Sequence, residues 1–432
     1  MQRAVAGPDS TTPPAGGPLS DTALAILAIL SFALAFALVS RRLTSRWLSA
    51  PMVFVAFGLA TGELGLGWLD VELERESMAL LAELTLVLVL FGDASRISLR
   101  ALRQEAGLPV RLLGLGMPLT ILLGTGLAIA LFPSLSMWEA ATLAAVLAPT
   151  DAALGQAVVS HPSVPLRVRQ ALNVEGGLND GIALPVVLVF AALATSSSHS
   201  ADHWLRFWLL QVTLGPLVGV VLGWAGAQAL SAASQHRWMD DTWERVGALA
   251  LAFLAYTAAE AVGGNGFMAA FTAGLTVGHT ARDVVACVHE FLEAEGQLLM
   301  LAVFIVLGAF LVPPSLGRMT PAMLGYAVAS LTVVRAVPVA LSMLGIGASR
   351  WTILFLGWFG PRGLASVIFG LLVLDEVGLP HGELVFDVVC ITVFASVVLH
   401  GVTATWGAER YGAYVEDVEG MEHQPVTHHP TR

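Results

Sequence analysis

The sequence predicts an all-α polytopic membrane protein, and three observations lead to that class. Hydrophobic residues make up 56% of the 432-residue chain and charged residues only 12%, whereas soluble domains contain about 25% charged residues. The mean hydropathy is +0.76. The apolar residues also gather in segments close to the roughly 20 residues that a helix needs to cross a bilayer. These observations exclude a water-soluble globule.

The apolar segments predict thirteen transmembrane helices within one membrane domain, residues 21–406. The expected spans are residues 21–40, 50–68, 78–95, 108–131, 137–159, 168–195, 206–231, 244–262, 264–280, 292–312, 321–345, 350–375 and 383–406. Residues 1–20 are rich in Pro, Gly, Ser and Thr and lack the pattern of a signal peptide. We expect a disordered extracytoplasmic tail there, and a short cytoplasmic tail over residues 407–432.

Arginines in the loops predict the orientation, because positively charged loops remain on the cytoplasmic side. Loops after odd-numbered spans contain Arg41, Arg42, Arg46, Arg96, Arg100, Arg103, Arg111, Arg167, Arg169, Arg237, Arg245, Arg282 and Arg350. Loops after even-numbered spans are poor in arginine, and the first of them is acidic (LDVELERE). We therefore expect a plasma-membrane protein with its N-terminus outside and its C-terminus in the cytoplasm.

The odd number of spans indicates two inverted six-helix repeats. With the seventh span set aside as a linker, spans 1–6 start from the outside and spans 8–13 start from the cytoplasm. Many secondary transporters share this arrangement, with discontinuous helices at matching positions of the two halves. The prediction is therefore a broken helix at the same place in each repeat.

Breaks are expected in the fifth helix of each repeat, spans 5 and 12, which contain LAPTDAALG and GWFGPRGLAS. Pro149 and Pro361 each remove a backbone donor within their helix. Non-helical backbone at membrane depth is tolerated only where it is buried in protein or lines a wet cavity. Because an ionisable residue lies beside each break, we expect the two breaks to mark a functional site.

Ionisable residues inside the spans predict a cation site, because such residues are costly in a membrane and usually functional. Four acids, against two deep arginines, leave an excess of negative charge. Burial favours the protonated form of a carboxyl group, so protons compete with a monovalent cation for the same oxygens. The residues are Glu83, Asp151, Glu175, Asp180, Arg335 and Arg362.

The segment NVEGGLNDGIALPVV places three polar residues within two turns of span 6. At 100° per residue, Glu175 and Asn179 lie about 40° apart, while Glu175 and Asp180 lie about 140° apart. We assign Glu175 to a structural ion pair with Arg335, and Asp180 to the binding of cation and proton. The alternatives are that Glu175 binds the ion and that Asp180 makes a helix-packing hydrogen bond.

The remaining polar residues are expected to complete the site. Thr150 offers hard oxygen ligands of the kind that suits Na⁺, and Asp151 can cap the following half-helix, bind the cation, or do both. Arg362 is expected to neutralise Asp151 or the facing helix C-terminal ends. Glu83 is either a further oxygen ligand or a polar helix contact. Asn179 adds no second carboxylate, which predicts that one proton exchanges for one monovalent cation.

The same segments resemble the monovalent cation/proton antiporter-1 family, which contains bacterial and archaeal Na⁺/H⁺ antiporters and the animal Na⁺/H⁺ exchangers. PTDAALGQAVV looks like its Thr-Asp-Pro motif, VEGGLNDGIALPV like its Glu-Ser-x-x-Asn-Asp-Gly motif, and FGPRGLASVIFG like its Gly-x-Arg-Gly motif. AEAVGGNGFMAAFTAGLTVG and AELTLVLVLFGDASRISLRALR are similar to two further signatures. The resemblance covers nearly the whole membrane region.

The resemblance implies a thirteen-helix fold, a core with crossed broken helices, a dimerisation part, and an elevator-like movement of the core. It also implies an electroneutral exchange of Na⁺, or of Li⁺ or K⁺, for H⁺ by a homodimer in the lipid bilayer. In the family the aspartate matching Asp180 binds cation and proton. Three departures stand out: Ala152 replaces a proline, Gly176 replaces a serine ligand, and Pro361 precedes the arginine.

Two other classes of protein also place acids in a membrane cavity. A cation channel needs neither two symmetric breaks nor a structural Glu–Arg pair. An intramembrane aspartyl protease needs two aspartates that share a proton, and the Gly-x-Gly-Asp context is absent here. We therefore expect no enzyme activity. Cys287 and Cys390 lie too far apart in sequence to indicate a disulfide or metal site, and no cofactor or nucleic acid is expected.

Overall fold

The computed structural model describes residues 21–43, 48–69, 75–97, 107–151, 154–195, 201–281, 296 and 298–416. The regular structure of these residues is helical, which confirms the all-α class. Seven described helical segments are long and apolar enough to cross a membrane. The count of thirteen spans and their inverted repeat stay predictions.

Helices cover the first half of the chain in the order α1 (Asp21–Leu43), α2 (Ala50–Thr61), α3 (Arg75–Arg96), α5 (Gly107–Arg111), η1 (Leu112–Gly116), α6 (Met117–Leu131), α7 (Met137–Val146), α8 (Gln156–Val159) and α9 (Leu166–Thr195). The second half contains α10 (Ala201–Gln235), α11 (Asp241–Ala261), α12 (Gly266–Thr280), η2 (Leu307–Leu311), α14 (Val312–Gly317), α15 (Pro321–Leu331), α16 (Val333–Ser342), α17 (Arg350–Trp358), α18 (Leu364–Leu372), η3 (Val373–Val377) and α19 (Gly382–Val415).

Short polar residues begin several of these helices. Ser136 and Glu139 form a capping box at the start of α7, and Asn265 accepts a hydrogen bond from the amide of Met268 at the start of α12. Ser349 caps α17 in the same way. Such side chains satisfy backbone N–H groups that a helix start leaves without a partner. The caps explain why α11 and α12 are separate helices despite a linker of only a few residues.

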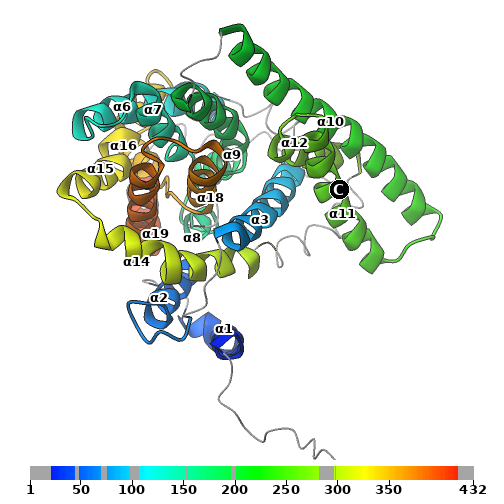
Figure 1. Ribbon diagram of the computed structural model, residues 1–432, viewed down its shortest axis with the longest axis horizontal. Coiled ribbons are helices and arrows are strands. Elements are labelled where there is room, and N and C mark those ends of the chain that lie inside the picture. Colours follow the sequence, from blue (N-terminus) through cyan, green and yellow to red (C-terminus); the bar gives the residue numbers. More distant parts are fainter. Residues whose placement is uncertain are drawn as a thin grey trace, which may run out of the picture.

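Figure 1 shows the helices in two main groups. One group gathers α6, α7, α9 and α15 to α19, and the other gathers α3, α10, α11 and α12. In the second group α12 packs closely on α3, and the glycines at positions 274 and 278 make this possible. A Cβ at Gly274 or Gly278 would collide with the backbone of Phe91 or Ser95. Small residues allow this close approach of helices in membranes.

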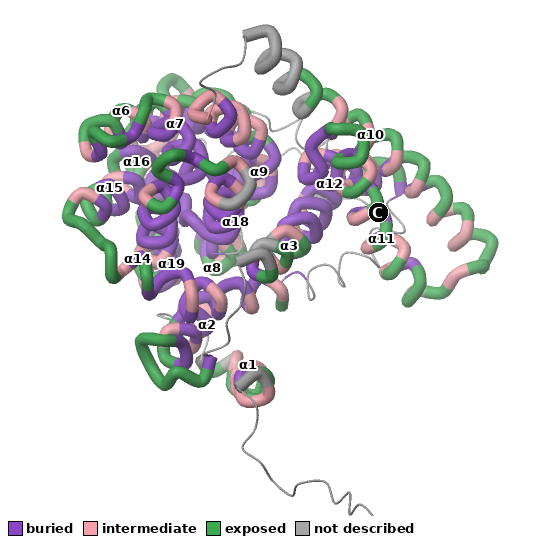
Figure 2. The backbone as a smooth tube through the Cα atoms, viewed as in Figure 1, coloured by how far each residue is buried: buried purple, intermediate pink, exposed green. Residues whose placement is uncertain are grey.

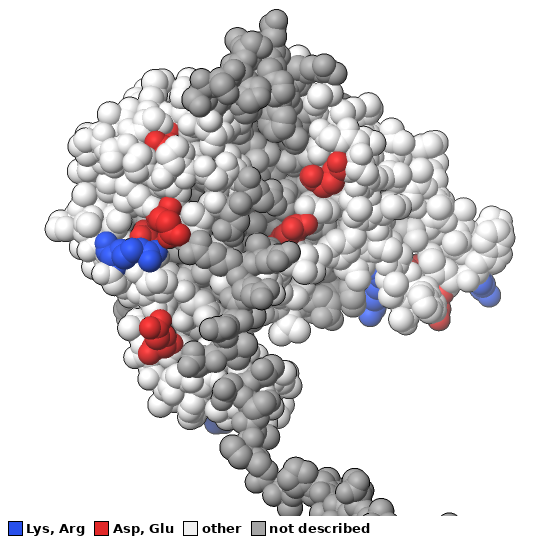
Figure 3. All heavy atoms as spheres, in the orientation of Figure 1, with Lys and Arg blue, Asp and Glu red and all other residues white. Residues whose placement is uncertain are grey.

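Burial is greatest where α7, α9, α18 and α19 meet (Figure 2). In α19, 72% of the most apolar window is buried, against 6% in α1. The face in Figure 3 carries few acidic or basic side chains among the residues coloured there. The exposed apolar surface of α1 is therefore suited to contact lipid, while α19 forms the centre of the protein interior.

Candidate ion-binding site

The chain is interrupted at both predicted places. The helix α7 ends at Val146, before Pro149, and α8 begins at Gln156. The helix α17 ends at Trp358, and α18 begins at Leu364 after Pro361. The two breaks touch, because the Asp151 amide donates a hydrogen bond to the Pro361 carbonyl at 2.8 Å.

Asp151 joins the breaks through its side chain as well. Its Oδ2 accepts a hydrogen bond from the Leu364 amide at 2.8 Å, and its Oδ1 accepts one from the Leu154 amide at 2.9 Å. One carboxylate therefore binds amides near the starts of α8 and α18, where the positive ends of helix dipoles favour negative charge. A Cβ at Gly363 would collide with this carboxylate, so the close approach requires glycine.

Arg362 contacts a helix C-terminus, whereas Asp151 contacts the starts of helices. Its side chain is fully buried, and its Nη1 donates hydrogen bonds to the carbonyls of Ala148 at 2.8 Å and Pro149 at 3.1 Å. These carbonyls follow the C-terminus of α7, where a helix dipole is negative. The sequence predicted that Arg362 neutralises Asp151 or the facing helix C-terminal ends. Its hydrogen bonds go to the carbonyls at such a helix end.

Asn179 of α9 binds the first break. Its Nδ2 donates to the Thr150 carbonyl at 3.1 Å and to the Thr150 Oγ1 at 2.6 Å. Both residues are buried. Within the described part of the chain, Asn179 Oδ1 has no hydrogen-bond partner. The amide therefore anchors Thr150 and leaves an oxygen for another ligand.

Asp180 follows Asn179 and is 8% exposed. Its Oδ1 is buried without a hydrogen-bond partner among the described residues. The charged groups that act on this carboxylate are those of Asp151 and Asp93. A buried carboxylate of this kind must be neutralised by a proton or a cation. The three acids converge on one place from α9, the first break and α3.

Asp93 is the site residue that sequence reasoning missed. It lies in α3, within the segment FGDAS, near the end of the predicted third span. The charge itself was the available signal. A single aspartate at a span end is also typical of a solvated helix terminus, so only the packing of α3 against α9 distinguishes the two roles.

Glu175 and Arg335 form an ion pair, with 2.5 Å between Oε1 and Nη1 and only 3% of each side chain exposed. Glu175 lies in α9 and Arg335 in α16, and this is the ion pair predicted from the sequence. The pair uses one oxygen of the carboxylate, and Glu175 Oε2 has no hydrogen-bond partner among the described residues. Arg335 thus offsets the charge of Glu175, while the described part of the chain gives Asp180 no ion pair with an arginine.

Glu83 is not brought to this group. It precedes Asp93 by ten residues in α3, which corresponds to about 15 Å along the helix axis. Its electrostatic neighbour is Glu260 of α11, whose Oε1 accepts a hydrogen bond from the Gly266 amide at 2.7 Å. Its predicted part as an ion ligand therefore stays a prediction.

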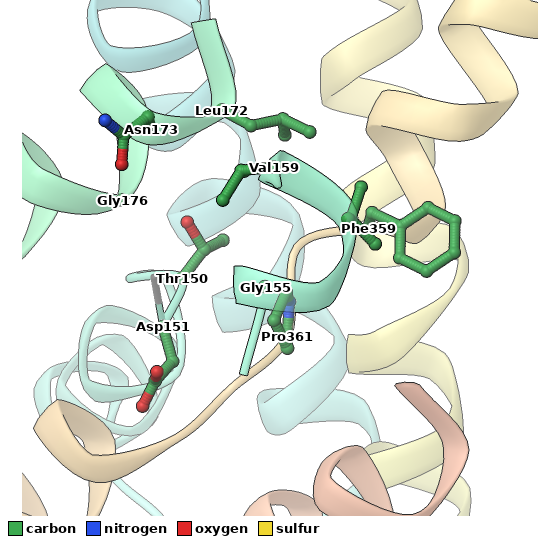
Figure 4. Close-up of a pocket in the computed structure, with 10 residues that line it drawn as sticks. Thr150, Asp151, Gly155, Val159, Leu172, Asn173, Gly176, Phe359 and Pro361 are labelled. Carbon is green, nitrogen blue, oxygen red and sulfur yellow. The ribbon is translucent and has the colours of Figure 1, made fainter. Parts of the chain in front are cut away.

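A small pocket opens beside the first break. It is lined by Thr150, Asp151, Gly155, Val158, Val159, Leu172, Asn173, Gly176, Phe359 and Pro361. Figure 4 shows Asn173 on one wall and Thr150 on the other, with the Asp151 carboxylate directed away from both. The lining is mainly apolar, and Thr150, Asp151 and Asn173 are its polar members.

Comparisons with known proteins identify a family and several relatives. The family model described as sodium/hydrogen exchanger, transmembrane, matches residues 27–410. The K(+)/H(+) antiporter NhaP of Alkalimonas amylolytica is 26% identical over 366 residues, which are 83% of this chain and 62% of that protein. The K(+)/H(+) antiporter NhaP2 of Shewanella oneidensis is 24% identical over 363 residues, with the same coverages. The chain thus spans about three fifths of the length of these relatives.

The fold is that of a solved antiporter. The sodium proton antiporter MjNhaP1 from Methanocaldococcus jannaschii, solved at pH 8, superposes with a TM-score of 0.72 and 18% sequence identity. The superposition covers 89% of this chain and 98% of that one. An electron-microscopy structure of the same antiporter gives a TM-score of 0.67.

Proposed function

The chain belongs to the sodium/hydrogen exchanger family, and from that premise we propose that it exchanges a monovalent cation for protons across the plasma membrane. The observation that carries the proposal is the buried Asp180 carboxylate, whose Oδ1 has no hydrogen-bond partner among the described residues. It lies where two interrupted helices cross and where two further carboxylates act on it. Such a group suits alternate occupation by a proton and a cation.

In this mechanism Asp180 binds either the proton or the cation, and never both. Thr150 contributes its hydroxyl or its carbonyl, and Asn179 its free Oδ1. Asp151 and Asp93 supply negative charge beside the ion. Glu83 is assigned to the outer path of the cation along α3. Dehydration of a monovalent cation is offset by such oxygen ligands.

The other charges keep the exchange balanced. Glu175 and Arg335 neutralise one another as a structural pair, and Arg362 compensates the carbonyl ends of the first break. Asn179 is neutral, whereas a carboxylate at this position would add a second negative charge. One proton then replaces one monovalent cation on Asp180, so the proposed exchange is electroneutral with a one-to-one stoichiometry.

Alternating access is proposed to occur by movement of the core against a dimer scaffold. With the orientation predicted from the loop arginines, the pocket beside Gly155 and Leu172 opens toward the cytoplasm. One of the two ions would bind there from the cytoplasm, and the core would carry it past the scaffold. The other ion would then bind on the outer side and be carried back. A homodimer in the bilayer is the proposed assembly.

Na⁺ is the proposed substrate, because hydroxyl, carbonyl and carboxylate oxygens are hard ligands. K⁺ is the second candidate, since the relatives from Alkalimonas and Shewanella are named K(+)/H(+) antiporters. Gly176 lines the pocket and brings no side-chain oxygen, which leaves more room for a larger ion. Li⁺ would bind through the same oxygens as Na⁺.

The test is cation-driven proton movement in proteoliposomes with the membrane potential clamped. Titrations of Na⁺, Li⁺ and K⁺ would compare the wild type with Asp180→Asn and with Glu383→Gln, a control at a half-exposed carboxylate on α19. We expect exchange that needs Asp180, is unaffected by Glu383→Gln and ignores potential. A steady cation current without proton movement would instead indicate a channel, and cleavage of a reporter peptide would indicate a protease.

A further inference from the structure

Two buried polar residues of α19 have no part in the exchange described above. Ser396 is fully buried and His400 is 1% exposed. They lie four residues apart, so they occupy the same face of α19, one turn from each other. That face meets the second break, between α17 and α18.

His400 and Ser396 contact the two sides of this break. His400 Nε2 lies 2.9 Å from the carbonyl of Trp358, the last residue of α17. The Ser396 hydroxyl accepts a hydrogen bond from the Arg362 amide at 2.7 Å. The two residues are connected, with 3.1 Å between His400 Nδ1 and Ser396 Oγ. One turn of α19 therefore holds both ends of the interruption.

The hydrogen-bond chemistry gives this chain a direction. A carbonyl oxygen only accepts, so His400 Nε2 carries the proton that is donated to Trp358. In a neutral imidazole Nδ1 is then an acceptor for the Ser396 hydroxyl, and it also lies 3.1 Å from the backbone carbonyl oxygen of Ser396. The hydroxyl oxygen keeps its lone pairs for the Arg362 amide. The Nε2–H tautomer thus serves the Trp358 carbonyl, the Ser396 hydroxyl and the Arg362 amide.

The anchored backbone is the backbone that contacts Asp151. Between Trp358 and Leu364, the Pro361 carbonyl accepts the Asp151 amide and the Leu364 amide binds the Asp151 carboxylate. The Arg362 amide lies in a non-helical segment, where a buried N–H without a partner would be costly. Trp358 is held a second time, since its Nε1 donates to the Thr403 hydroxyl at 3.0 Å.

We propose that His400 is a positioning residue of the ion site, which acts by fixing the second break against α19 through Trp358 and Ser396. The proposal rests on the exchange function proposed above. His400 touches no ion ligand, and the charged groups that act on its ring are Arg362 and Arg335. Its role is therefore to donate to the Trp358 carbonyl and to bind Ser396, not to carry protons.

The test compares His400→Ala, His400→Gln and Ser396→Ala. Thr392→Val is the matched control, because Thr392 is equally buried on α19 but its hydroxyl bonds only to Val388 of the same helix. In proteoliposomes we expect His400→Ala and Ser396→Ala to raise the cation KM by about tenfold, because each removes buried hydrogen bonds that hold the break. The maximal rate per folded protein should change by less than about twofold, because neither variant removes a residue assigned to bind the ion.

His400→Gln sharpens the test, since its amide can donate to Trp358 but cannot titrate. We expect it to restore a KM near that of the wild type and to leave the pH profile of exchange unchanged. An unchanged KM in His400→Ala, or an equal loss in Thr392→Val, would overturn the positioning role. A shifted pH profile in His400→Gln would mean that His400 carries protons.

A structural readout separates this inference from the exchange function. Backbone hydrogen exchange over residues 358–364 should be faster in His400→Ala than in the wild type and in Thr392→Val. If wild-type proteoliposomes exchange no cation, the proposed function fails, and the amide exchange still decides whether His400 fixes the break. Equal protection of these amides in all three proteins would refute the anchoring.

Discussion

The two interrupted helices differ in the charge that each carries at its break. The first break holds an acid, Asp151, which binds backbone amides. The second holds a base, Arg362, which binds backbone carbonyls. Each side chain reaches across to the other helix. The acid and the base therefore act on opposite halves of the crossing and on opposite kinds of helix end.

This difference follows from the polarity of helix termini. A helix start leaves N–H groups without partners, and a helix end leaves C=O groups. A carboxylate suits the first and a guanidinium suits the second. The C-terminus of α17 instead receives the neutral His400 at Trp358. The C-terminus of α7 is thus compensated by arginine and the C-terminus of α17 by histidine.

Replacing Arg362, the base of the second break, should have the largest effect on stability. Arg362→Gln removes a fully buried side chain that makes two hydrogen bonds to carbonyls. We expect a loss of about 3 kcal/mol in the free energy of unfolding, because hydrogen bonds from charged groups contribute about 1.5–3 kcal/mol. Unfolding of the purified protein would measure it, with exposed Arg350→Gln as the control. A loss no greater than that of the control would contradict the role of Arg362.

The close contact between the breaks gives the next prediction. Gly363→Ala places a Cβ against the Asp151 carboxylate, and such overpacking costs about 1–3 kcal/mol. Gly177→Ala is the matched control, since a Cβ there meets no atom within 4 Å and alanine favours a helix interior by about 0.5–1 kcal/mol. Thermal unfolding should therefore move in opposite directions. Similar shifts for both variants would show that the breaks tolerate separation.

Replacing the acid should have a smaller effect on stability than on function. Asp151→Asn keeps one acceptor oxygen for two amides, Leu154 and Leu364, and loss of a cap costs about 1 kcal/mol. The same change removes a negative charge that acts on Asp180, so cation binding should weaken. Isothermal titration would measure the affinity beside the unfolding curve. Unchanged affinity would mean that Asp151 acts only as a cap.

Much of the candidate site could be predicted because its signals are local. Pro149 and Pro361 indicate the breaks through the chemistry of one residue. An unpaired charge in an apolar helix requires a partner, which suggested Glu175 with Arg335, and the structure has these groups in contact. The sequence did not distinguish Glu83 from Asp93 as the acid of α3 that acts on Asp180, because both are acids of one helix.

The sequence by itself determined the membrane class, the interruption of the two helices and the excess of acids in the spans. Composition, proline chemistry and charge require no knowledge of neighbours. Only the tertiary structure decided which acid of α3 faces Asp180, which backbone groups Arg362 binds, and that His400 holds the second break. These depend on the rotation and axial shift of each helix against the next, which are set by packing over the whole interface.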